Sequence, residues 1–119
     1  MTQGARTDRV AEEFREILAE EVQRLKDPRI GFVTVTHVEV SPDLQHAWAY
    51  YTVLGDDSQQ RGTAAGLRSA VPHLRHELGR QVRLKTVPEL EFRIDETAAS
   101  NRRIDEIIDQ LHREEGTDA

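Results

Sequence analysis

The sequence predicts one α+β domain with the element order α-β-β-α-α-β, followed by one further helix. Three observations lead to this fold class. Apolar residues recur at helical spacing in separate parts of the chain, β-branched residues gather in stretches of strand length, and the connection before the last strand is long enough to join parallel strands. We therefore expect a three-stranded mixed sheet with helices on one face. The 119 residues leave room for a single core.

The first helix is indicated by an apolar stripe that runs from Val10 to Leu25. Asp8 precedes this stripe and has the side chain of an N-cap. Residues 1–7 show no such periodicity, so we expect them to form a flexible tail. Asp27 precedes a proline, and the helix should end there because a residue before proline is pushed out of the α region.

Two strands should follow as an antiparallel hairpin. The stretch Ile30–Val40 is rich in β-branched residues and too short for a good helix. Its alternation changes phase between Val35 and Val38, which predicts a bulge or a strand covered on both faces. Residues 41–44 have turn chemistry, with a proline and an aspartate. The second strand then runs from His46 to Leu54.

A pair of helices is expected after the hairpin. Gly55–Ser58 closes the second strand and offers an N-cap. One apolar stripe then continues from Leu67 to Val82. A proline within this stripe removes a helical hydrogen bond and clashes with the preceding turn, so we predict two helices that share one buried face. The predicted kink between them consists of Ser69, Ala70, Val71 and Pro72.

The last strand, Leu90–Ile94, alternates between apolar and charged residues, and its apolar side chains, including Ile94, are expected to point inward. The preceding helices give the crossover that a parallel pairing with the second strand requires. A C-terminal helix should begin at Ser100, which is followed by an apolar stripe. The domain would thus span residues 8–112, and residues 113–119 would form a flexible acidic tail.

The helix pair carries an unusual charge. The chain has a formal net charge of −6, yet the stretch from Arg61 to Lys85 contains many basic residues and a single acid, Glu77. Basic side chains on one face neutralise phosphates and release counterions, which favours RNA as a ligand. The other interpretation is that they serve solubility alone. The candidates for phosphate contacts are Arg61, Arg68, Arg75, Arg80, Arg83 and Lys85, with Arg6, Arg9, Lys26 and Arg29 as a second group.

Catalysis finds little support in the sequence. No G-x-S-x-G motif or phosphate-binding loop occurs, and the chain has no cysteine. His73, His76 and Glu77 are spaced to touch one ion, but no third-ligand cluster accompanies them. We therefore expect no enzymatic activity, no cofactor and no metal site.

Composition also bears on where the protein works. Charged residues make up 32% of the chain, and no apolar run approaches the roughly 18 residues that a membrane span needs. Residues 1–6 lack the apolar core of a secretory signal. We expect a cytoplasmic protein with no membrane partner.

Three separated motifs resemble the ribosome-binding factor A family. The resemblance covers roughly the stretch from Ala5 to Leu111. The motifs are Asp27–Thr36 with its continuation through Val38–Leu44 to Tyr51–Gly55, then Val82–Phe92, and finally Asp95–Thr97 followed by Asn101–Asp105.

The resemblance implies a type II KH-like domain. It also implies a non-catalytic assembly factor that binds the small ribosomal subunit and its ribosomal RNA late in maturation. Family members act on the RNA around the neck and decoding region, support processing of its 5′ end, and are needed especially in the cold. The interhelical kink of the family, usually Ala-x-Gly, is matched by Ala70–Pro72. Proline in place of glycine makes this kink stiffer.

The expected mechanism is differential binding, in which the protein binds an immature conformation of the subunit better than the mature one. An assembly GTPase is a further candidate partner, and the protein is expected to be a monomer. The alternative function is a protein-interaction module that docks on a ribosomal protein or an assembly GTPase without direct RNA contact.

Overall fold

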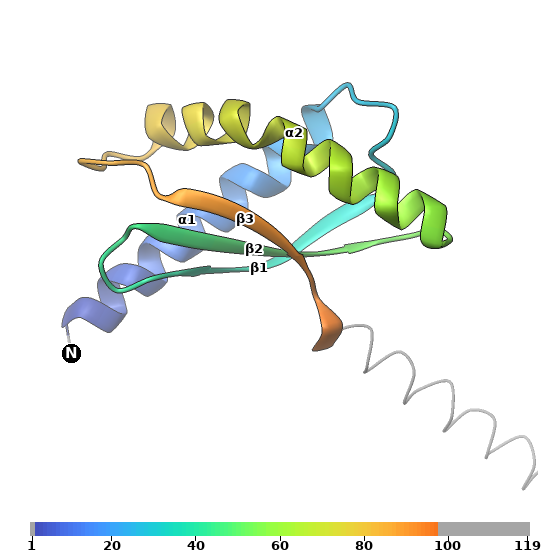
Figure 1. The fold of residues 1–119 in the computed structure, drawn as a ribbon. Helices are drawn as coiled ribbons and strands as arrows, with labels where there is room; N and C mark the ends of the chain where they lie inside the picture. The colour runs from blue at the N-terminus through green and yellow to red at the C-terminus, as the bar shows by residue number, and fades with distance from the viewer. Residues whose placement is uncertain (1, 98–119) are drawn as a thin grey trace, which may run out of the picture.

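The structure, a computed structural model, describes residues 2–97. Its element order is α-β-β-α-β (Figure 1). The helix predicted after Ser100 and the tail predicted at residues 113–119 lie outside the described residues. The elements are α1 (Thr2–Arg24), β1 (Val33–Val40), β2 (His46–Val53), α2 (Asp57–Gln81) and β3 (Glu89–Ile94).

The three strands form one mixed sheet in the order β1-β2-β3. β1 and β2 pair antiparallel, and β2 and β3 pair parallel, so both predicted pairings are confirmed. The register between β1 and β2 shifts between Val35 and His37. This irregularity is the predicted bulge, and it explains why the apolar alternation of β1 changes phase.

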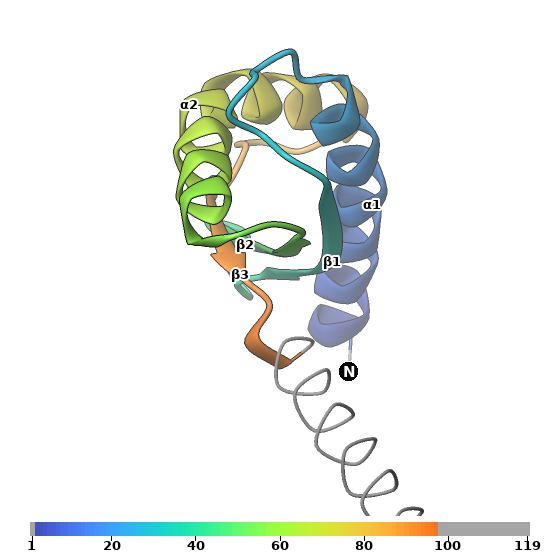
Figure 2. The same cartoon turned by 90° about the vertical axis from the view of Figure 1, so that its right-hand side faces the viewer.

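The helices bury one face of the sheet. α1 packs against β1 and α2, and α2 also packs against β3, an arrangement that can be followed in Figure 2. Along β2 every second residue is buried, while the residues between them, such as Trp48 and Tyr50, remain partly exposed. The expectation of helices on one face is therefore confirmed. The fully buried side chains at the centre of the core include Phe14, Leu18, Leu67, Leu74 and Leu78.

The predicted break at Ser69–Pro72 is wrong, because α2 continues through it as one helix from Asp57 to Gln81. Pro72 still removes one hydrogen bond from the helix interior, and the ribbon of α2 changes direction along its length in both views (Figures 1 and 2). Leu67 and Leu74, on either side of the proline, are both completely buried. Burial of this shared stripe stabilises a bent continuous helix over two separate ones.

The predicted bounds of the first helix also differ from the structure. α1 begins at Thr2, so the helix includes most of the predicted tail, and Asp8 lies inside it instead of capping it. Extending an existing helix adds one hydrogen bond per residue fixed, and no proline upstream prevents it. At the other end α1 stops at Arg24, ahead of Asp27.

The start of α2 gives a testable stability effect. Asp56 is the N-cap: its carboxylate accepts a hydrogen bond from the backbone N–H of Gln59 at 2.8 Å, and the Gln59 side chain accepts one from the backbone N–H of Asp56 at 2.8 Å. We expect Asp56→Ala to lower the free energy of unfolding by about 1 kcal/mol, measured by urea denaturation. Asp57→Ala is the matched control, and an equal loss in both variants would contradict this assignment of the cap.

Candidate nucleic-acid interface

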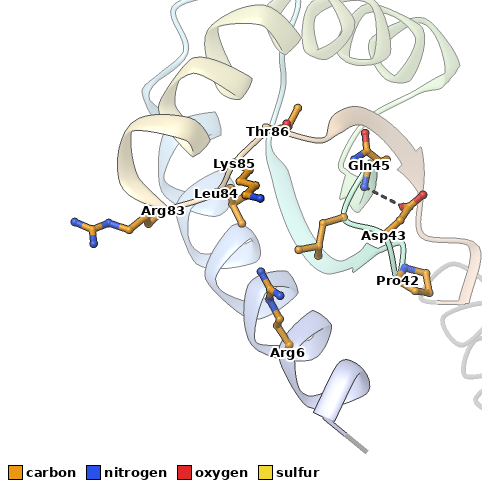
Figure 3. A pocket seen from close by; sticks show the side chains of 9 residues that line it. Arg6, Pro42, Asp43, Gln45, Arg83, Leu84, Lys85 and Thr86 are labelled. Carbon is orange, nitrogen blue, oxygen red and sulfur yellow. Dashed lines mark hydrogen bonds between the residues drawn. The ribbon is translucent and has the colours of Figure 1, made fainter.

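The structure brings basic residues from the two ends of the described chain together. Arg6 and Arg9 lie on α1, and Arg83 and Lys85 lie on the loop between α2 and β3; all four are exposed. Within residues 2–97 they make no hydrogen bond or ion pair. Figure 3 shows Arg6 rising from α1 toward the loop that carries Lys85, whereas Arg83 points outward.

These residues surround a surface hollow that we call the basic hollow. Its volume is about 670 Å³. A neighbouring hollow of about 540 Å³ shares Arg6, Arg83 and Leu84 with it and adds Arg9 to the basic wall. The two hollows form one open surface, in which the described cations face two acids, Asp43 and Glu13. The lining residues of the basic hollow are Arg6, Pro42, Asp43, Leu44, Gln45, Arg83, Leu84, Lys85 and Thr86.

The far wall of the basic hollow is the turn between β1 and β2. The Ser41 hydroxyl donates a hydrogen bond to Asp43 at 2.7 Å and accepts one from the backbone N–H of His46 at 3.0 Å. Together with a backbone N–H from Gln45, it lowers the pKa of Asp43. The carboxylate that faces the cations is therefore held within its own turn. The sequence indicated this turn but not its proximity to Arg6 and Lys85.

Arg75 has a structural function. Its side chain is half-buried, and its Nε and Nη2 atoms donate hydrogen bonds to the backbone oxygens of Pro88 and Val87, both at 2.9 Å. These bonds fasten α2 to the segment that leads into β3. The predicted phosphate contact at Arg75 would compete with them.

Arg80 is exposed but paired. It lies 2.7 Å from Glu77, one turn away on α2. Hydrogen bonds from Arg80 and Gln81 lower the pKa of Glu77, so the carboxylate is charged near neutral pH and offsets the charge of Arg80. Arg80 thus contributes less to the local positive potential than Arg83 does.

Arg61 and Arg68 lie on a different surface, between α2 and β3. Each lines a hollow that also contains Tyr51 and Ala64, with volumes of about 350 Å³ at Arg61 and about 300 Å³ at Arg68. Ile94 lines the hollow at Arg61 and is 40% exposed. Ile94 nevertheless lies beside the buried Tyr51 in the sheet register and lines this hollow together with residues of α2. It therefore faces the helices, as predicted, but they cover it only in part.

Lys26 and Arg29 follow the opposite end of α1 from Arg6. Arg29 is paired with Asp27 at 2.6 Å and donates a hydrogen bond to the Ser69 hydroxyl at 3.2 Å. It therefore lies beside the bend of α2. Close packing fixes this position, since a Cβ atom on Gly66 would lie 2.6 Å from a side-chain carbon of Ile30.

Two other kinds of site are absent from the described residues. No group of three or more His, Cys, Asp or Glu side chains there could hold a metal ion. No helix in residues 2–97 is long and apolar enough to cross a membrane.

Comparison with known proteins decides the family. A family model described as ribosome-binding factor A matches residues 6–108. The chain belongs to the ribosome-binding factor A family. A ribosome-binding factor A from Geobacter sulfurreducens is 44% identical over 95% of this chain and 97% of its own length. One from Geobacter metallireducens is 46% identical over 93% and 95%, respectively.

Solved structures of ribosome-binding factor A share the fold. The crystal structure of the factor from Thermus thermophilus superposes with a TM-score of 0.67 at 31% identity, covering 74% of this chain and 94% of the other. A homology model of the Thermus thermophilus factor, fitted into a cryo-electron microscopy map of a 30S complex, gives a TM-score of 0.60 at 32% identity over 70% and 88% of the two chains.

Proposed function

We propose that this protein is a non-catalytic assembly factor that binds the immature small ribosomal subunit and its ribosomal RNA during late maturation. The main support for the proposal is the basic hollow. This hollow and the neighbouring hollow together contain four cations that are unpaired within the described residues. These cations come from distant parts of a chain whose net charge is negative. A relative in the same family has been fitted into a map of a 30S complex, which agrees with a subunit-sized ligand.

The proposed phosphate contacts centre on Arg6, Arg9, Arg83 and Lys85. Long exposed cations that have no partner in residues 2–97 can neutralise phosphates without first breaking a bond there. Arg61 and Arg68 would extend the contact along the groove between α2 and β3, and Lys26 and Arg29 would extend it at the bend of α2. Arg80 is a weaker candidate because Glu77 neutralises it.

The bend of α2 is the second part of the proposed interface. In a KH-like domain the corresponding connection between helices meets the RNA backbone. Here Ser69 and Pro72 are exposed at the bend, with Arg29 beside them. Because proline fixes the backbone, we propose that RNA is held there by side chains and not by close approach to the main chain.

The proposed mechanism is a shift of conformational populations. A protein that binds an immature arrangement of the RNA better than the mature one holds that arrangement until assembly is complete. Processing of the RNA 5′ end would then be supported by delaying the mature fold. We further propose that the protein acts as a cytoplasmic monomer, that its function matters most in the cold, and that an assembly GTPase is a partner.

Salt dependence separates RNA binding from docking on a ribosomal protein or GTPase. Binding of the purified protein to small subunits, and to their RNA stripped of protein, would be measured at about 50 and about 200 mM salt. Direct RNA contact predicts binding to both ligands that weakens steeply as salt rises. Binding to whole subunits alone, with little salt dependence, would instead support the protein-docking function.

A further inference from the structure

The face of the sheet that the helices leave uncovered has its own chemistry. We call it the open sheet face. The register places Trp48 at its centre, with Glu39 opposite on β1 and Glu91 opposite on β3. In the next row, Tyr50 has His37 and Arg93 as its cross-strand neighbours. Neither row takes part in the core or in the basic hollow.

The aromatic and histidine rings on the open sheet face contact one another. His46 stacks on Trp48 with 6.0 Å between ring centroids, and His37 stacks on Tyr50 at 5.9 Å. The guanidinium of Arg93 lies 5.7 Å from the centroid of Trp48 and pairs with Glu91 at 3.2 Å. Arg93 therefore shows, within the same chain, how this face holds an arginine: an indole ring below it and a carboxylate beside it.

The remaining charges on the face are acidic. The side chains of Glu39, Glu91 and Glu89 are 55%, 60% and 78% exposed, respectively. Glu39 is paired with His37 and Glu89 with His46, each at 3.5 Å. The described part of this face therefore carries three carboxylates and a single permanently charged cation, Arg93. Such a surface repels phosphates and attracts cations.

We propose that the open sheet face binds an arginine-rich segment of a protein partner. One guanidinium would lie on Trp48 and pair with Glu39, in the way that Arg93 pairs with Glu91 on the other side. Further cations would meet Glu89. The proposal does not depend on the RNA contacts of the basic hollow, which lies on other elements.

Trp48 is the only tryptophan of the chain, so its fluorescence reports directly on this face. The probe is a nine-residue oligoarginine peptide added to the full-length protein at low salt. We expect a saturable change in Trp48 fluorescence. A nine-residue oligolysine should bind about two- to five-fold more weakly, because guanidinium groups stack on aromatic rings better than ammonium groups do.

Variants test which groups hold the peptide, with a labelled oligoarginine as the anisotropy probe. We expect Glu39→Gln/Glu89→Gln to weaken binding about five-fold, through loss of two exposed ion pairs. Trp48→Leu should weaken it about three-fold. The control, Glu16→Gln/Glu20→Gln, makes the same change of charge at two exposed positions of α1 and should leave the affinity within about two-fold. Circular dichroism would confirm that each variant is folded.

Three results would overturn the proposal. Equal weakening by the test and control pairs would show that the open sheet face is not the site, and so would the absence of any binding. The third result concerns RNA: a dodecamer of uridine that quenches Trp48, and binds more tightly to Glu39→Gln/Glu89→Gln, would show a base-stacking surface instead.

Discussion

The Arg75→Ala variant should lose about 2 kcal/mol of its free energy of unfolding. The Arg75 guanidinium donates to the backbone oxygens of Val87 and Pro88, and removing it leaves both acceptors without these donors in a partly buried place. Hydrogen bonds from charged groups contribute about 1.5–3 kcal/mol each when buried, and partial exposure reduces this. Urea denaturation followed by circular dichroism measures the change.

Arg68→Ala is the control for Arg75→Ala. Arg68 lies on the same helix and is exposed, so its removal should change the free energy of unfolding by less than about 0.5 kcal/mol. Equal stability of the two variants would show that the contacts of Arg75 do not hold β3 in place. In that case Arg75 would again be a candidate for phosphate contact.

Charge reversal at the basic hollow should weaken subunit binding without unfolding the domain. We expect Arg83→Glu/Lys85→Glu to lower the affinity for the small subunit by about 10- to 100-fold at low salt. The slope of log affinity against log salt should also become shallower by about 2, one for each lost phosphate contact. A salt series of binding measurements gives both quantities.

Arg15→Glu/Arg24→Glu provides the matched charge change on α1. Both arginines are already paired with glutamates of the same helix, so their reversal should disturb RNA binding much less. Should the control pair weaken binding as strongly as Arg83→Glu/Lys85→Glu, net charge would govern the affinity and the basic hollow would not be a specific surface.

Much of the fold could be predicted because it depends on local patterns. The strands, their pairing and the bulge near Val35 follow from alternation and from connection length. The continuity of α2 could not be predicted in this way. At Pro72 the local rule for proline opposes a stripe that buries Leu67 and Leu74 completely, and the tertiary packing outweighs the local rule.

Less of the candidate site than of the fold could be predicted from the sequence. The sequence shows the concentration of arginines, but the functions of individual arginines depend on tertiary contacts. Nothing in the local pattern indicates that Arg75 reaches the carbonyls of Val87 and Pro88. The proximity of Arg6 to Lys85 likewise arises only when the sheet places α1 beside the loop that precedes β3. The pairing of Arg80 with Glu77, in contrast, could be read from their helical spacing.

Preference for an immature particle is the central claim, and sedimentation tests it most directly. The purified protein would be centrifuged with immature and with mature small subunits at low and moderate salt. We expect preferential binding to the immature particle, weakened by salt and by Arg83→Glu/Lys85→Glu. Equal binding to both particles, or binding to neither, would contradict the proposed function.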